Sequence, residues 1–82
     1  MVKITFLNLL RSKYGIETLI VEPGKMNDIF NVILSKHPEI EAKDFQDSVM
    51  FVNQKRIPHA TRFDTVLQEG DEVVFTHFLG GG

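Results

Sequence analysis

The 82-residue sequence lacks cysteine altogether and has no tryptophan. The missing cysteines exclude a disulfide scaffold, a thiolate metal site and a cysteine nucleophile. Apolar runs long enough to cross a bilayer are also missing, and no signal peptide precedes the first predicted strand. We therefore expect a cytoplasmic protein.

An excess of one sign of charge is also missing: the net charge is only −2, and acidic and basic residues are interspersed. With no basic stripe, the sequence argues against a nucleic-acid partner. The histidines His37, His59 and His77 lie far apart and lack the spacing of metal ligands. No glycine-rich phosphate loop or G-x-S-x-G nucleophile motif is present. We expect no metal, no cofactor and no catalytic machinery within the chain.

What the sequence does contain is an apolar fraction of 43%, with seven phenylalanines, enough for one small core. Alternating residues predict a half-buried strand over Val2–Asn8, with Val2, Ile4 and Phe6 on one face. We expect a turn over residues 9–15, with Gly15 at positive φ. A second strand over residues 17–22 then pairs with the first in an antiparallel hairpin.

A helix is predicted over Met26–Lys36, where apolar residues recur on one face and Pro38 ends the pattern. Asn27 or Asp28 is expected to cap its start or to complement the helix dipole. A polar connection follows over residues 39–47, anchored by Ile40 and Phe45. Its carboxylates resemble a solvated loop, not a metal site or an acid–base pair.

The second half predicts three more strand segments. Residues 48–53 form a nearly continuous apolar run, interpreted as a central strand buried on both sides. A turn and a short strand at Arg56–Ile57 follow. A tight turn over residues 68–71 leads into a final strand over residues 72–78, with Val73 and Phe75 directed inward.

This order predicts an α+β roll, in which a mixed sheet of four to five strands carries one main helix across its inner face. The folded domain is expected to span residues 1–78, with a flexible tail over residues 79–82. If the first and last strands are parallel neighbours at the sheet centre, the tail leaves from the middle of one sheet end. The outer face is a plausible docking surface, with four apolar residues expected there: Leu7, Ile20, Met50 and Val74.

Three glycines, Gly80, Gly81 and Gly82, end the chain directly after a hydrophobic strand. Glycine loses more backbone entropy on ordering than other residues and buries no side chain, so we expect a mobile thread. The apolar residues before it, Phe78 and Leu79, are suited to burial in a partner. The glycines alone are equally compatible with a frayed terminus or a cloning remnant.

The whole pattern resembles the ubiquitin-like β-grasp sulfur carriers, the family of the molybdopterin-synthase small subunit and the thiamine sulfur carrier. Three stretches carry the resemblance: Phe6-x-x-Leu9-x-Arg11-x-x-x-Gly15; Val52-Asn53-Gln54; and Leu67-x-x-Gly70-Asp71-Glu72-Val73, followed after six residues by Gly80-Gly81-Gly82. The last is the most specific. The triple glycine is closer to some thiamine carriers, whereas the long first hairpin is closer to the molybdopterin-synthase subunit.

The resemblance implies a β-grasp fold and a particular chemistry at Gly82. An ATP-dependent activating enzyme of the ubiquitin-activating type adenylates the terminal carboxylate, and a sulfur donor converts it into a thiocarboxylate. Gly80 and Gly81 supply the thread, and Phe78 and Leu79 dock it. The chain is then a substrate of enzymes, not an enzyme, and the sulfur acceptor is a synthase large subunit or another enzyme, most simply in molybdopterin biosynthesis.

Other functions remain open at the level of sequence. The same chain could carry sulfur for thiamine, cysteine or tRNA thiolation. It could also be a ubiquitin-like modifier joined to target lysines through Gly82, because modifiers use the same adenylation step. A third alternative is a β-grasp interaction domain with an inert tail.

Overall fold

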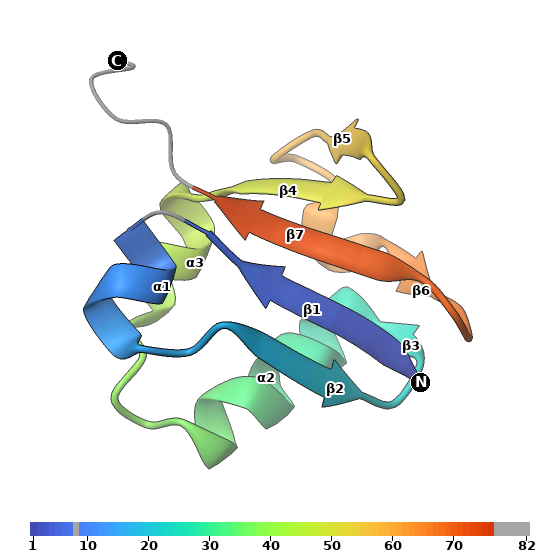
Figure 1. Ribbon diagram of the computed structural model, residues 1–82. Helices are drawn as coiled ribbons and strands as arrows, with labels where there is room; N and C mark the ends of the chain where they lie inside the picture. Colours follow the sequence, from blue (N-terminus) through green and yellow to red (C-terminus); the bar gives the residue numbers. More distant parts are fainter. Residues whose placement is uncertain (8, 77–82) are drawn as a thin grey trace.

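A five-stranded mixed sheet organises the computed structural model, which describes residues 1–7 and 9–76 (Figure 1). The strand order is β2-β1-β7-β4-β5. These strands are β1 (Val2–Phe6), β2 (Thr18–Val21), β4 (Val49–Val52), β5 (Lys55–Ile57) and β7 (Glu72–Thr76). Strands β1 and β7 are parallel and every other neighbouring pair is antiparallel. The predicted α+β roll is confirmed, and its first and last strands are parallel neighbours at the sheet centre.

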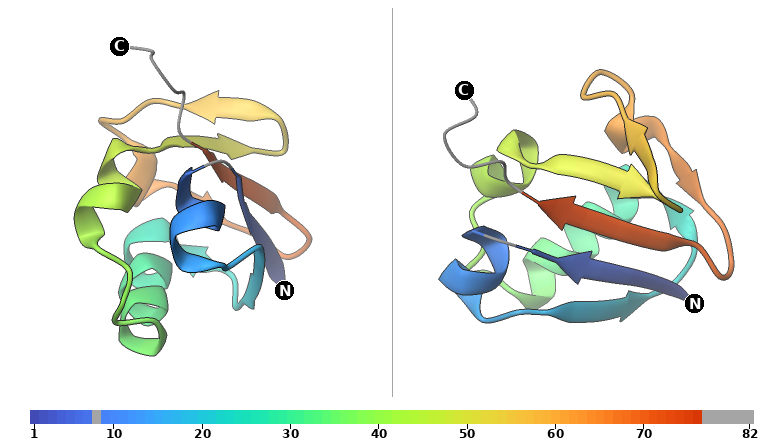
Figure 2. Two further views of the ribbon diagram at one scale, coloured as in Figure 1. Left: turned by 60° about the vertical axis from the view of Figure 1, so that its left-hand side comes forward. Right: turned by 45° about the horizontal axis from the view of Figure 1, so that its top comes forward.

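The remaining elements connect these strands. They are α1 (Leu9–Tyr14), α2 (Met26–Lys36), α3 (Ala42–Asp47), the 3₁₀ helix η1 (Arg62–Asp64) and a small antiparallel pair formed by β3 (Gly24–Lys25) and β6 (Val66–Leu67). Figure 2 shows that α2 and α3 lie on the same face of the sheet. The opposite face carries no helix among the described residues.

Helix α2 packs its apolar stripe onto the inner sheet face, as its periodicity predicts. Its buried residues are Met26, Ile29, Phe30 and Ile33. Of the two roles predicted for Asn27 or Asp28, capping does not occur, because Lys25 occupies the N-cap position and no side chain caps the helix. Asp28 lies in the first turn instead, where its negative charge is favourable beside the helix dipole.

The segment over residues 9–15 was expected to be a turn. It contains the helix α1 instead, so this prediction is wrong. The helix ends where Gly15 takes a φ of +68°, and the Gly15 N–H donates to the Arg11 carbonyl at 2.8 Å. This is a glycine-terminated helix end with a residue in the left-handed conformation. The positive φ predicted for Gly15 is thus confirmed, and β1 still pairs antiparallel with β2.

The polar connection expected over residues 39–47 also contains a helix, α3. Its anchors were predicted correctly, since Ile40 is 6% exposed and Phe45 is fully buried. The Phe45 ring centroid lies 5.5 Å from that of Phe6, 5.1 Å from that of Phe30 and 5.0 Å from that of Phe75. Phe45 therefore joins β1, α2 and β7 at the centre of the core.

Strand β4 differs from its prediction in two ways. It is next to the β5 edge of the sheet, not central, and Phe51 and Val52 are only half-buried. Met50, expected on the outer face, is fully buried in the core. It pairs with Phe75 on the inner face, which leaves Phe51 on the outer one. The predicted turn after the strand is confirmed, with Asn53 and Gln54 both at positive φ.

Candidate functional site

The last described residue of β7, Thr76, lies at the end of the central strand of the sheet, beside α1 and α3 (Figure 1). The parallel pairing with β1 continues to this end, where Phe6 pairs with Phe75 and the Leu7 N–H donates to the Phe75 carbonyl at 2.9 Å. The chain thus enters its C-terminal segment from a strand held on both sides. The predicted site residues Phe78, Leu79, Gly80, Gly81 and Gly82 lie outside the described residues.

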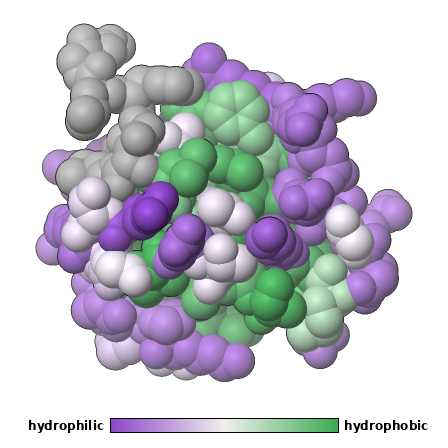
Figure 3. Space-filling model, in the orientation of Figure 1, coloured by the Kyte–Doolittle hydropathy of each residue, from purple (hydrophilic) through white to green (hydrophobic). Residues whose placement is uncertain are grey.

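The outer face of the sheet brings together part of the predicted docking surface. Leu7 is 38% exposed and Ile20 is 58% exposed, while Val74 is half-buried between them and β4. Phe51 pairs with Val74 and takes the place predicted for Met50. Figure 3 shows apolar surface on this face, interrupted and bordered by hydrophilic residues. We call Leu7, Ile20, Phe51 and Val74 the outer patch; Lys3 and Thr5 of β1 lie on the same face between Ile20 and Val74, so the patch mixes apolar and polar side chains.

The supporting motif Val52-Asn53-Gln54 and the Gly70-Asp71-Glu72 part of the most specific motif meet at the other end of β7. Asn53 Nδ2 donates to Asp71 Oδ1 at 3.0 Å, and the Glu72 N–H donates to Asn53 Oδ1 at 3.0 Å. The Gln68 N–H donates to Asp71 Oδ2 at 2.8 Å, across the turn in which Gly70 has a φ of +87°. These bonds join the start of β7 to the β4–β5 turn. These motif residues therefore have a structural role, and they lie at the end of the sheet opposite Thr76.

The Asp71 carboxylate is expected to make stability depend on pH. The hydrogen bond from the Gln68 N–H, helped by the Asn53 amide, lowers the pKa of Asp71 below its ordinary value. A lowered pKa in the folded state stabilises the fold above the ordinary Asp pKa of about 3.9, and this contribution disappears as the pH falls below it. Asp71→Asn should lower the urea midpoint at neutral pH, and its deficit should vanish in strong acid. A deficit that is independent of pH would contradict this assignment.

A polar network that the sequence did not predict joins α1 to α3 near the Thr76 end of the sheet. Lys13 Nζ lies 2.8 Å from Asp44 Oδ2 and 3.5 Å from Glu41 Oε2. The Tyr14 hydroxyl also donates to Asp44 and accepts from the Glu41 N–H at 3.1 Å. The hydrogen bond to Asp44 raises the pKa of Lys13 above its ordinary value. These contacts fix the two short helices against each other.

Arg62 is a second feature that the sequence did not predict, since it is only 1% exposed. It donates to the carbonyl of Phe45 at 2.7 Å and to that of Ser48, at the C-terminal end of α3. Burial lowers the pKa of this guanidinium. Cations at a helix C-terminus satisfy its free carbonyls, so Arg62 stabilises the end of α3 and the buried position of Phe45.

The two described histidines, His37 and His59, belong to no cluster of metal ligands. His37 Nδ1 lies 3.6 Å from Glu39 Oε2, His59 lies in an exposed loop, and His77 is outside the described residues. Over residues 1–7 and 9–76, no group of three or more possible metal ligands comes together. In the same part of the chain, no helix has the length and hydrophobicity needed to cross a membrane.

Comparison with known protein families then decides the relationship, because a family model described as "ThiS family" matches residues 4–82, nearly the whole chain. The chain belongs to the ThiS family. This is a family of small carrier proteins, and the match includes the glycine tail. A search of curated protein sequences finds no match.

Solved structures show that the ThiS-family chain shares the β-grasp fold of ubiquitin-like carriers and modifiers. Small archaeal modifier protein 1 from Methanosarcina acetivorans has a TM-score of 0.78 and 21% identity, covering 99% of this chain and 95% of that one. A chain from the complex of subunits 1 and 2 of molybdopterin-converting factor from Helicobacter pylori has a TM-score of 0.67 and 18% identity, covering 99% and 97%. A chain of the Amycolatopsis orientalis BexX/CysO complex has a TM-score of 0.73 and 13% identity, covering 100% of both.

Proposed function

We propose that this chain is a cytoplasmic sulfur carrier whose Gly82 carboxylate is adenylated and then converted into a thiocarboxylate. The observation that supports this most is the family match, which runs from β1 through the terminal glycines. The position of β7 supports it too. The strand that leads to the tail is the central one of the sheet and is hydrogen-bonded on both sides, to β1 and to β4.

The proposed chemistry needs only the terminal carboxylate from this chain. A C-terminal carboxyl has a pKa of about 3.3–3.7, so it is an anion at neutral pH. One of its oxygens attacks the α-phosphate of ATP and pyrophosphate leaves, which gives an acyl adenylate. Hydrosulfide then attacks the acyl carbon and AMP leaves with the bridging oxygen, so one carboxyl oxygen is replaced by sulfur. Glycine at the terminus leaves this acyl carbon unhindered.

The partners proposed are an adenylating enzyme, a sulfur donor and a sulfur acceptor. Two of the similar structures are complexes with another protein, BexX in one case and the second subunit of molybdopterin-converting factor in the other. By analogy, the outer patch would dock such a partner while the tail enters its active site. The four residues 79–82 reach at most about 13–14 Å when extended, enough to enter a buried site.

For the pathway, we propose molybdopterin biosynthesis, with a synthase large subunit as the acceptor. The opening Phe6-x-x-Leu9-x-Arg11-x-x-x-Gly15 supports this choice, as does the similarity in fold to molybdopterin-converting factor. The sulfur-loaded carrier should then convert a molybdopterin precursor when mixed with a synthase large subunit. Transfer to a thiazole synthase or a sulfhydrylase instead would assign the carrier to thiamine or cysteine.

Intact-mass spectrometry tests the carrier proposal directly. After incubation with ATP, an adenylating enzyme and sulfide, the chain should gain the mass difference between one sulfur and one oxygen. The gain should require ATP and should map to the C-terminal peptide. Conjugates of high mass that contain Gly82 joined to lysine, with no sulfur exchange, would instead identify a ubiquitin-like modifier.

A further inference from the structure

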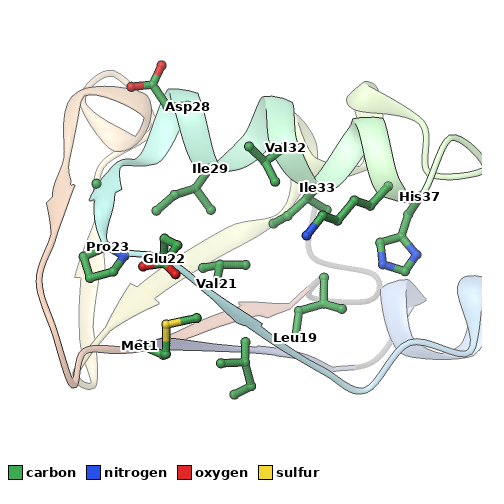
Figure 4. Close-up of a pocket in the computed structure, with 13 residues that line it drawn as sticks. Met1, Leu19, Val21, Glu22, Pro23, Asp28, Ile29, Val32, Ile33 and His37 are labelled. Carbon is green, nitrogen blue, oxygen red and sulfur yellow. The ribbon is translucent and has the colours of Figure 1, made fainter.

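A groove lies between the edge strand β2 and helix α2, away from the described end of β7 (Figure 4). Its volume is about 370 Å³, within the range of sites that bind ligands in proteins. Apolar side chains dominate it: Leu19, Val21, Pro23, Ile29 and Ile33, with Met1, Ile20 and Val32 at its border. Ile20 and Val32 are 58% and 46% exposed, which leaves apolar surface in water beside the groove.

The backbone of β2 adds unpaired hydrogen-bonding groups to this groove. Strand β2 ends the sheet and pairs only with β1. The Phe6 N–H donates to the Glu17 carbonyl, and antiparallel ladders alternate, so Leu19 and Val21 are the residues of β2 that bond to β1. The N–H and C=O groups of Thr18 and Ile20 therefore point to the open side of the sheet.

The other sheet edge is protected in a way that β2 is not. Strand β5 carries Lys55 and Arg56, and Pro58 follows it. Charged residues and proline are the usual means by which proteins prevent an edge strand from pairing with another chain. The segment Thr18–Val21 has neither. Glu22 and Pro23 follow β2, but the strand itself is the less protected of the two sheet edges, and it lies beside an apolar groove.

The two ends of the groove carry opposite charges. Glu22 and Asp28 lie at the end near Pro23, whereas His37 lies at the other end near Leu19, and Lys36 precedes it (Figure 4). Over residues 1–7 and 9–76, no ion pair involves Glu22, Asp28 or Lys36. These three charges are available to a ligand, and they define its direction.

We propose that this groove binds an extended peptide segment of a partner protein as a sixth strand, antiparallel to β2. Alternate apolar side chains of the peptide enter the groove, and its backbone bonds to Thr18 and Ile20. Antiparallel pairing is the more stable arrangement per residue. The N-terminal end of the peptide then lies beside Glu22 and Asp28 and carries a basic residue. Its C-terminal end lies beside Lys36 and carries an acidic one.

The length of the edge favours a peptide over a second copy of this chain. Four residues of strand span only about 13 Å. Stable protein dimers bury about 1,200–2,000 Å² in total, which such a short edge does not readily supply. Strand addition of a short peptide, in contrast, needs only main-chain bonds and one or two side-chain pockets. None of the groove residues belongs to the tail, so this inference goes beyond the proposed sulfur chemistry.

The probe is a synthetic peptide, acetyl-Gly-Lys-Val-Ile-Val-Asp-Gly-amide, titrated into the full-length ¹⁵N-labelled protein. Amide shifts should change over residues 18–22 and 28–37. Hydrogen exchange should slow at the Thr18 and Ile20 N–H groups, and should not change at Leu19 and Val21, which already bond to β1. Exchange of the peptide's Lys and Asp positions should weaken binding, because each charge then meets its own sign.

Two variants and a matched control give the side-chain test. Val32→Glu places a charge at the groove border and should weaken binding at least about tenfold. Val66→Glu changes an equally accessible valine outside the groove, 63% exposed, and should leave binding unchanged. Lys36→Glu should weaken binding about two- to fivefold at low salt, as expected for an exposed ion pair. When the Lys36→Glu variant binds the peptide with its Lys and Asp exchanged, the new pairing at position 36 should recover at most this two- to fivefold loss of affinity.

Three results would overturn the proposal. One is the absence of shifts in residues 18–22 and 28–37 at millimolar peptide. Another is unchanged hydrogen exchange at Thr18 and Ile20 when the peptide is bound. The third is a dimer, seen by sedimentation equilibrium and abolished by Val32→Glu, which would assign the groove to a second copy of the chain.

Discussion

Removal of Gly82 is expected to reduce adenylate and thiocarboxylate formation by at least about 100-fold. The shortened chain still ends in a glycine carboxylate, Gly81, so the chemistry of the reacting group is the same. Its position changes by one residue, about 3.5 Å of extended chain. A displacement of only about 1 Å at a reacting centre can cost about 100-fold in rate. The rate of ATP-dependent oxygen-to-sulfur exchange, followed by intact mass, measures the loss.

Gly82→Ala is the matched variant, because it keeps the length and adds a single methyl group beside the acyl carbon. It should retain more activity than the deletion, which separates reach from steric hindrance. Both variants should unfold at the wild-type temperature, since the change lies beyond β7. If the deletion variant exchanged oxygen for sulfur at the wild-type rate, the exact position of the terminal carboxylate would not limit the reaction, and the requirement for Gly82 would be wrong.

The parallel β1–β7 pair at the sheet centre could be predicted from the sequence, because element order strongly limits the topology. Two strands, a helix of crossover length and a final strand leave few arrangements without a left-handed connection. Helix α2 was equally predictable, since its eleven residues carry a full apolar stripe. The candidate site was proposed separately, from the terminal glycines and the motif that precedes them.

Helices α1 and α3 were not predicted, because each has only six residues. Helical periodicity is read over windows of about 11–18 residues, so a helix this short leaves no clear pattern. Their stability depends on tertiary contacts instead. Lys13 and Tyr14 of α1 bond to Asp44 of α3, and Arg62 satisfies carbonyls at the end of α3. Such partners are distant in sequence, and a buried arginine contradicts the usual rule that charged residues are exposed.

The exchange of Met50 for Phe51 on the outer face has a different cause. The run Val49–Val52 is apolar throughout, so it has no alternation from which to assign faces. A shift of one residue then moves every side chain to the opposite face. The faces of β7 were predicted correctly, because the charged Glu72 marks the exposed face and so places Val73 and Phe75 on the buried one. The outer patch could therefore be predicted only in part.

Phe45→Ala is expected to reduce the free energy of unfolding by about 3–5 kcal/mol, as is typical for loss of a buried phenylalanine. The ring is fully buried and contacts Phe6, Phe30 and Phe75. Its removal leaves a cavity shared by β1, β7 and two helices. Small domains have only about 5–15 kcal/mol in total, so the variant should approach unfolding at physiological temperature. Urea unfolding followed by circular dichroism measures the change.

Phe63→Ala is the control, because Phe63 is half-buried and its ring contacts that of Phe30 alone among the described aromatic pairs. It should cost only about 1 kcal/mol. The backbone carbonyl of residue 45 survives the Phe45→Ala change, so its bond from Arg62 is kept and the loss reports the ring. Equal losses in the two variants would show that Phe45 is not the centre of the core. A much larger loss of unfolding free energy for Phe45→Ala would show that α3, a helix too short to be predicted from its sequence pattern, holds the central strands together through Phe45.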